Sequence, residues 1–171
     1  MNTIHVKLQK ADRLATITQK VGFALWQLQE LEVVTAQYYV LVTQAKRGMG
    51  LAAGTTILDR AQSKTFGTTV NNLVKAKLLP TNIAVRFQKL LGERNWLVHS
   101  SRASSRNAIH SDSMCTRLLD RLERISEEAL TLLKEIETHR EVFVRKHGVR
   151  AEQIDEMAAQ ILQQWQGNET I

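Results

Sequence analysis

The chain contains 171 residues, of which 43% are hydrophobic and 23% charged, the balance of one globular domain rather than of a disordered chain. One proline and eight glycines are too few turn-forming residues for a β-sheet protein of this length, so the composition predicts an all-α fold. The formal net charge of +6 favours a polyanionic partner such as nucleic acid, although many soluble proteins carry this charge without binding one.

The first helical pattern extends from about Leu14 to Ala45, where apolar or small residues recur at alternating steps of three and four. This spacing predicts a stripe of apolar residues along one face of a helix, either in one long helix or in two helices with a break near Gly22. Further apolar residues widen the stripe. The helix is therefore expected to touch neighbours on more than one side, as in a bundle.

The glycine-rich segment 47–54 (RGMGLAAG) interrupts this pattern and predicts a loop. A phosphate-binding loop is the alternative, but the spacing matches no common fingerprint and no strand precedes it. A short helix is expected over Ile57–Gln62. Gly67 and Thr68 then offer a start, and Pro80 an end, for a helix of about ten residues.

The next helix is expected to be capped by Thr81 or Asn82 and to run to about His99. The serine-rich segment Ser100–Ser113 that follows is predicted to be a loop. Because it is longer than most connections in compact domains, we expect it to be functional or mobile.

The last long helix has the clearest pattern in the sequence. Asp112 or Ser113 caps it, a strict heptad period holds over Cys115–Phe143, and the helix is expected to end near Gly148. A further short amphipathic helix is expected over Ala151–Gln166. The sequence thus predicts an up-and-down helical bundle in which long antiparallel helices and short additional helices form a single domain over residues 1–171.

The chain carries no pattern typical of a secreted or membrane protein. Its single cysteine, Cys115, excludes an internal disulfide and fits a reducing compartment. No stretch approaches the roughly 20 apolar residues of a membrane span, and the N-terminus lacks the apolar run of a secretory signal. We therefore expect a cytoplasmic protein without a membrane partner.

Most kinds of chemical site are absent from the sequence. No two of the five histidines lie at a helical metal-chelating separation, and only one cysteine is present, so no metal site is expected. The sequence also lacks a P-loop lysine and a serine nucleophile in a strand-to-helix elbow.

The segment LLGERNWLVHSSR, residues 90–102, carries the candidate site. On a helix ending at His99, Arg94 lies near the middle of an apolar arc, while Asn95 and His99 lie together on its flank. Trp96 points to the other side. An arginine in an apolar arc indicates a buried partner or an interface. The alternatives are that it snorkels or forms a structural ion pair, for example with a glutamate of a neighbouring helix. Asn95 and His99 could likewise cap the helix end.

The stretch RNWLVH, residues 94–99, resembles the R-x-x-x-x-H signature of HEPN domains, a superfamily of small helical bundles. The residue after the arginine is often asparagine in that family, and Asn95 matches. The order of elements, KTFGTTVNNL, then a proline, then a helix ending in ERNWLVH, is also similar. The resemblance covers roughly residues 21–145.

The resemblance implies metal-independent RNA cleavage by a homodimer in which the arginine and histidine of both protomers share a cleft. His99 would take the proton of the RNA 2′-hydroxyl or donate one to the departing 5′ oxygen, since a histidine side chain titrates near pH 6.5. Arg94 would clamp the phosphate and stabilise the charge that develops on it. Asn95 would orient the phosphate or hold His99. The product would be a 2′,3′-cyclic phosphate, with no cofactor.

Three further residues are candidates for RNA binding. Arg102 and Arg106 could contact the RNA backbone, or they could belong to a solvated loop. Trp96 could stack on a base, or pack against another helix or the second protomer. Many HEPN toxins controlled by a nucleotidyltransferase antitoxin carry a tyrosine two residues after the histidine, where this chain has Ser101.

The expected function is that of a toxin or defence ribonuclease, with an antitoxin or regulatory protein as a further partner. One alternative is a non-catalytic HEPN-like module that binds RNA, a nucleotide or a protein. A second alternative is a helical adaptor whose heptad seams are themselves the binding surface.

Overall fold

The computed structural model describes residues 3–46 and 48–148, together with Glu152, Gln153, Glu156, Ala159, Gln160 and Gln163. These residues form α-helices and connections without a strand, which confirms the predicted all-α fold. Contacts divide the chain into two compact units, Met1–Ile136 and Glu137–Ile171. Most of the short helix expected over Ala151–Gln166 lies outside the described residues.

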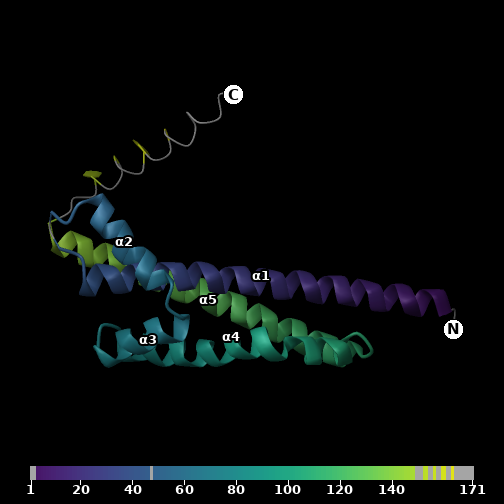
Figure 1. Ribbon diagram of the computed structural model, residues 1–171. Helices are drawn as coiled ribbons and strands as arrows, with labels where there is room; N and C mark the ends of the chain where they lie inside the picture. Colours follow the sequence, from purple (N-terminus) through teal and green to yellow (C-terminus); the bar gives the residue numbers. More distant parts are fainter. Residues whose placement is uncertain are drawn as a thin grey trace. The chain divides into compact units, whose positions relative to one another are not determined.

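The first unit is built from three long helices and two short ones (Figure 1). The long helices run in alternating directions, as expected for an up-and-down bundle. In chain order, the helices are α1 (Thr3–Thr43), α2 (Leu51–Gln62), α3 (Phe66–Lys75), α4 (Thr81–Ala108) and α5 (Asp112–Lys146), of which α5 belongs to the first unit as far as Ile136.

One hydrophobic core holds these helices together. Its residues recur at steps of three and four along each long helix, so each helix buries one stripe. The heptad period predicted for the last helix is confirmed throughout its part of the first unit. The most deeply buried side chains are Ile17, Leu28 and Leu31 of α1, Phe87, Leu90 and Leu97 of α4, and Leu122, Ile125, Leu132 and Ile136 of α5.

Each pair of long helices is also joined by ion pairs between side chains. Lys20 of α1 reaches Glu123 of α5, with 3.4 Å between Nζ and Oε1. Arg86 of α4 donates to Glu128 and Glu135 of α5 at 2.7 and 2.5 Å, and these hydrogen bonds raise the pKa of the guanidinium. The third pair, α1 and α4, is joined within the candidate site.

The first helix is longer than predicted. It is continuous through Gly22 and begins at Thr3 rather than near Leu14. Arg13 fixes it to the connection between α4 and α5 by donating to the carbonyl oxygen of Ile109 at 3.1 Å and pairing with Asp112. None of the residues from Thr3 to Thr16 is buried, which is why the core pattern alone did not indicate this part of the helix.

The loop predicted over 47–54 is wrong in its second half, because α2 begins at Leu51. The hydroxyls of Thr55 and Thr56 donate to the carbonyl oxygens of Leu51 and Ala52, both at 3.0 Å, so this first turn is hydrogen-bonded despite Gly54. The helix packs its Ala61 against α1, where a small second cluster forms.

The loop predicted over Ser100–Ser113 is also wrong for most of its length, because α4 continues to Ala108. The hydroxyl of Ser101 donates to the Leu97 carbonyl oxygen at 2.5 Å, and that of Ser105 to the Ser101 carbonyl oxygen at 2.8 Å. Both bonds run back along the helix, so these serines satisfy their hydroxyls without ending it. Ser101 and Ala108 are buried, and the bundle holds this part of α4 in place.

Two predicted caps and one predicted helix start are wrong by one or two residues, since α3 begins at Phe66 rather than at Gly67 or Thr68. Thr65 caps α3, since its hydroxyl accepts from the backbone N–H of Thr68 at 3.3 Å. Pro80 itself is the N-cap of α4 and offers no side-chain bond. The hydroxyl of Ser111 accepts from the Met114 N–H at 3.4 Å at the start of α5.

In the second unit, α5 ends at Lys146, close to the predicted end at Gly148. Gly148 has φ of +83°, a left-handed conformation that glycine adopts without steric cost and that commonly ends a helix. Among the helices of the described residues, none is sufficiently long and apolar to cross a bilayer.

Candidate functional site

The continuation of α4 past His99 aligns four of the predicted site residues. At about 100° per residue, Asn95, His99, Arg102 and Arg106 fall within about 60° of one another around the helix. All four side chains are exposed. They follow one another over roughly 16 Å of the helix axis, because each residue adds about 1.5 Å. We call this row of four residues the α4 stripe.

Arg94 occupies a core-facing position between buried Leu90 and Leu97. Its Nε donates to Glu32 Oε1 of α1 at 3.2 Å, so the ion pair with a neighbouring glutamate that the sequence left open is present. The two side chains remain 32% and 27% exposed. The pair is therefore not sealed in the core, and solvent reaches it.

The guanidinium of Arg94 keeps donors for a ligand. Within the described part of the chain, the Nε bond to Glu32 is its only hydrogen bond, which leaves both terminal Nη amino groups available. An Arg fork matches two oxygens of a phosphate. An anion could therefore approach Arg94 without displacing the carboxylate that holds it.

Arg94 and His99 do not meet within one chain. Five residues of helix separate them by about 140° around the axis, so Arg94 faces α1 while His99 lies in the exposed α4 stripe. A site using both side chains on one phosphate needs a second molecule or a substrate that passes around α4.

Trp96 lies on the opposite flank of α4 and faces α5. The side chain is half-buried against the core, and the guanidinium carbon of Arg121 lies 3.5 Å from its ring centroid, a cation–π contact. Glu93 holds this arginine, with 2.8 Å between Arg121 Nε and Glu93 Oε2. One ring face of Trp96 is thus occupied by the protein's own arginine.

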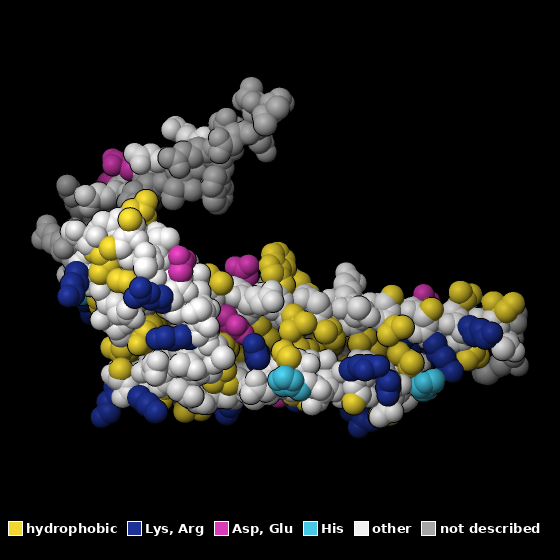
Figure 2. Space-filling model, in the orientation of Figure 1, with side chains coloured by type: hydrophobic (Ala, Val, Ile, Leu, Met, Phe, Trp, Pro, Cys, Tyr) yellow, Lys and Arg dark blue, Asp and Glu magenta, His cyan; other side chains and the backbone are white. Residues whose placement is uncertain are grey.

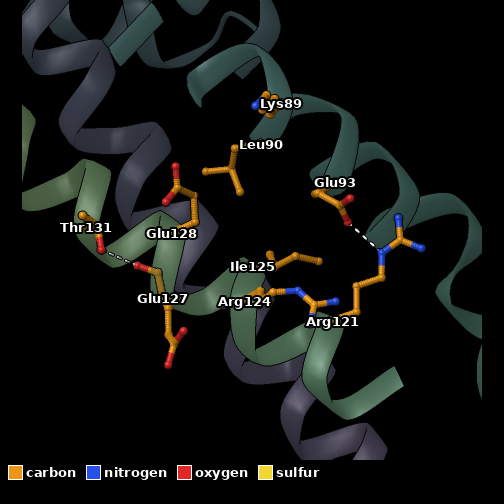
Figure 3. Close-up of a pocket in the computed structure, with 9 residues that line it drawn as sticks. All are labelled: Lys89, Leu90, Glu93, Arg121, Arg124, Ile125, Glu127, Glu128 and Thr131. Atoms are coloured by element: carbon orange, nitrogen blue, oxygen red, sulfur yellow. Dashed lines mark hydrogen bonds and ion pairs between the residues drawn. The ribbon is translucent and has the colours of Figure 1, made fainter. Parts of the chain in front are cut away.

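A groove of about 500 Å³ lies between α4 and α5 beside this contact (Figure 3). Leu90 and Ile125 form its apolar floor. Lys89 and Arg124 have no ion pair among the described residues, whereas Arg121 is neutralised by Glu93. The groove therefore presents two cations, Lys89 and Arg124, and one carboxylate, Glu127, that have no ion pair among the described residues, over an apolar base. Its remaining lining residues are Glu128 and Thr131.

Sequence reasoning did not identify the arginines of this groove. Arg117, Arg121 and Arg124 recur at steps of four and three on α5, beside the buried heptad positions, and that spacing was the available signal. Of these, Arg121 and Arg124 line the groove, and Arg117 lies with Arg121 and Trp96 in an adjoining groove of about 390 Å³.

No group of three or more His, Cys, Asp or Glu side chains suited to a metal ion occurs in the part of the chain that the structure describes. The candidate site instead offers an imidazole, an amide and three guanidinium groups. These groups can bind a phosphodiester and transfer protons to and from it.

No family model, curated protein or solved structure matches the chain. The resemblance to HEPN domains therefore stays a prediction.

Proposed function

We propose that this protein is a homodimeric, metal-independent endoribonuclease of HEPN type, acting in the cytoplasm as a toxin or defence factor under the control of an antitoxin or regulatory protein. The observation that carries the proposal is the α4 stripe. It places an exposed imidazole in one row with an amide and two guanidinium groups, while Arg94, 32% exposed, keeps free donors on the side of α4 that faces α1.

The reaction needs only what these side chains supply. One copy of His99 takes the proton of the 2′-hydroxyl while the 2′ oxygen attacks phosphorus, and the second copy gives a proton to the departing 5′ oxygen. Arg94 stabilises the negative charge on the phosphorane, and Asn95 orients the phosphate. The products are a 2′,3′-cyclic phosphate and a free 5′-hydroxyl.

RNA binding is assigned to the distal part of the stripe. Arg102 and Arg106 lie one and two turns beyond His99 and contact successive backbone phosphates. Trp96 is assigned to stacking on a base at its exposed edge, since Arg121 covers one ring face. Single-stranded RNA suits this arrangement because its backbone can follow a helix surface.

The second candidate function is a non-catalytic HEPN-like module. It is favoured by the ion pair between Arg94 and Glu32, which gives the arginine a structural partner within its own chain. In such a module RNA or a protein would bind to the same surface without being cut.

Cleavage of a single-stranded RNA in EDTA tests the proposal. The wild type is expected to yield 2′,3′-cyclic phosphate ends, and a substrate with one 2′-deoxy nucleotide is expected to resist cleavage at that position. His99→Ala and Arg94→Ala should each lower the cleavage rate at least about a hundredfold, the usual loss when an acid–base or charge-stabilising group is removed.

His110→Ala is the matched control, because His110 is equally an exposed histidine near α4 but lies outside the stripe. It should cleave at the wild-type rate. Unchanged cleavage in both His99→Ala and Arg94→Ala would overturn the assignment. RNA binding without cleavage by the wild type would favour the non-catalytic module.

A further inference from the structure

Arg121 of α5 lies between the two grooves along α4 and α5, and it lines both of them. Its guanidinium carbon is 3.5 Å from the ring centroid of Trp96. At this distance the planar group lies flat on the ring, because an edge-on approach would bring its nitrogens into the ring. Glu93 holds the same side chain at its edge, with 2.8 Å between Arg121 Nε and Glu93 Oε2 (Figure 3). The guanidinium is thus fixed by one face and one edge, and its second face is left to the grooves.

The second face of Arg121 offers a ligand a plane rather than a free charge. Glu93 compensates the charge, and the side chains of Arg121 and Glu93 remain 36% and 39% exposed. RNA bases stack on arginine planes as well as on aromatic rings. A side chain that is already immobilised loses little conformational freedom when a ligand binds to it. Arg121 is therefore suited to hold a nucleobase.

Cations lie on both sides of this plane. Arg117 and Arg124 flank Arg121 on α5, about 6 and 4.5 Å away along the helix axis. Arg117 donates its Nε to a backbone carbonyl oxygen at 3.3 Å, and its terminal amino groups make no hydrogen bond to the described residues. Lys89 lies with Arg124 in the larger groove, where Glu127 is the one carboxylate without an ion pair among the described residues. The phosphates on either side of a stacked base can therefore each meet a guanidinium.

Glu93 distinguishes one kind of base from another. Its Oε2 accepts from Arg121, while its Oε1 accepts no hydrogen bond from the described residues. Because Glu93 lines the larger groove, this oxygen is available to a ligand there. A carboxylate accepts hydrogen bonds and does not donate them, so it pairs with the exocyclic amino group of cytosine or adenine. It repels the carbonyl oxygen that uracil carries in place of the cytosine amino group.

We propose that Arg121 forms a base-selective subsite, in which a base with an exocyclic amino group stacks on the free face of the guanidinium and donates to Glu93. Arg117 and Arg124 bind the flanking phosphates. We call this set of residues, together with Trp96, the Arg121 platform. Trp96 supports the guanidinium from its other face and meets the same base only at its exposed edge.

The inference deepens the proposed nuclease and rests on it for the source of the base, which is the RNA strand that is cut. Trp96 and His99 are three residues apart on α4, so their side chains are neighbours on the helix surface. Figure 2 shows histidine and basic side chains at the surface along α4. The base on the Arg121 platform therefore belongs to a nucleotide adjoining the phosphate at His99, and cytosine or adenine is preferred there over uracil.

Titration with two mononucleotides tests the platform directly. Cytidine and uridine monophosphate have the same size and charge, and they differ chiefly at the group that faces Glu93. The indole N–H signal of Trp96, followed by NMR, reports binding at the site, and that of Trp26 on α1 is an internal control. Only the Trp96 signal is expected to shift, with a dissociation constant about tenfold lower for the cytidine nucleotide.

Ribose 5-phosphate, which has the phosphate but no base, is the control ligand. It is expected to bind more weakly than either nucleotide, because it cannot stack on Arg121. Equal affinities for the three compounds would show a simple anion site and overturn the inference. A Trp96 signal that neither nucleotide shifts would overturn it as well.

Two substitutions separate the plane from the carboxylate. Arg121→Lys keeps the charge and removes the plane, so the affinity for cytidine monophosphate should fall about tenfold. Arg124→Lys, on the same helix, is the matched control and should bind the nucleotide as the wild type does. Glu93→Gln should bind the cytidine and uridine nucleotides equally, because an amide can both accept and donate.

The Glu93→Gln comparison remains decisive if Arg121→Lys does not fold, since the amide oxygen still accepts from Arg121 Nε. A Glu93→Gln protein that prefers the cytidine nucleotide as strongly as the wild type would refute the selection by Glu93. A folded Arg121→Lys protein with unchanged affinity would refute the stacking.

Cleavage of matched RNAs connects the platform to the proposed function. The substrates differ only in one nucleotide beside the cleaved bond, varied on each side in turn. At one of the two positions kcat/KM should be about tenfold higher with cytosine than with uracil, and Glu93→Gln should remove the difference.

The two proposals can fail separately in these assays. Selective nucleotide binding by a protein that cuts no RNA supports the platform and counts against the nuclease. Cleavage that is indifferent to the neighbouring base, in a protein that still binds the cytidine nucleotide selectively, would make a free nucleotide the ligand. That result would overturn the role of the platform in RNA recognition and leave the nuclease in place.

Discussion

Arg94 combines a structural contact with an exposed edge. It occupies a position of α4 where a hydrophobic residue would fit the core, yet its pair with Glu32 remains accessible to solvent. An arginine kept only for stability could be replaced at such a position by a packed hydrophobic side chain. An arginine with free Nη donors at this position is expected if the guanidinium also binds an anion, with Glu32 fixing its orientation.

Replacing Glu32 tests this positioning role. Within the proposed nuclease, Glu32→Ala should lower kcat by about tenfold, since loss of a group that orients a catalytic residue commonly costs ten- to a hundredfold. Glu32→Gln retains an oxygen that can accept from Arg94 Nε, and should recover most of the activity. Cleavage rates and thermal unfolding are measured on the same preparations.

Glu123→Gln is the matched control, because Glu123 forms an interhelical pair with Lys20 that is more exposed. It should leave kcat unchanged. If Glu32→Ala loses stability but keeps the wild-type kcat, the carboxylate serves the fold alone and the positioning role is refuted.

At the scale of the helix, α4 shows how one element serves two purposes on different faces. Leu97 is buried in the core, while its neighbour Val98 is 47% exposed beside the stripe. Leu97→Ala should therefore lower the free energy of unfolding by about 2–5 kcal/mol, whereas Val98→Ala should cost less than about 1 kcal/mol. Urea unfolding of both variants measures the difference. An equal loss of unfolding free energy in both variants would contradict the assignment of Leu97 to the core face of α4 and Val98 to its exposed face.

The heptad seams of the long helices could be predicted from sequence, because apolar spacing reports directly which face is buried. The end of α4 could not. Ser101 and Ser105 are typical loop residues by composition, and only tertiary packing around Ser101 and Ala108 makes them helical. This error concealed the α4 stripe, since Arg102 and Arg106 align with His99 only if the helix continues.

The candidate site was predicted in part. The motif from Arg94 to His99 was visible as a short pattern, and its helical placement is confirmed. Glu32 lies 62 positions before Arg94, and no local pattern in the sequence indicates which glutamate of α1 reaches it. Val98 shows a related limit, because helix angle places it in the apolar arc of α4 but does not say how far a neighbouring helix extends, and the side chain is exposed.

At the scale of the whole molecule, the positive charge is concentrated on α4. This helix contains five basic residues, Arg86, Lys89, Arg94, Arg102 and Arg106, and one acidic residue, Glu93, which gives a net charge of +4. No acidic residue follows Glu93 before Asp112. A polyanion that binds there meets no carboxylate along the α4 stripe, and its affinity should depend strongly on salt.

The salt dependence of RNA binding is therefore predicted to identify the bound surface. In a His99→Ala background, which prevents cleavage, the logarithm of the association constant should fall linearly with the logarithm of salt concentration. Each phosphate contact on single-stranded RNA contributes about 0.7 to the slope. Replacing Arg102 and Arg106 with glutamine should thus reduce the slope by about 1.4 for each bound chain, as measured by fluorescence anisotropy.

Replacing Lys75 and Lys77 with glutamine provides the control, since it removes the same charge from exposed positions at the end of α3. General attraction between a basic protein and RNA would make both double variants equally weak, because long-range attraction follows net charge. Contact along α4 would leave the slope of the lysine variant unchanged. A slope that does not change when Arg102 and Arg106 are replaced would refute RNA contact along the α4 stripe. The next candidates would be Arg117, Arg121 and Arg124 on α5, which border the α4–α5 grooves.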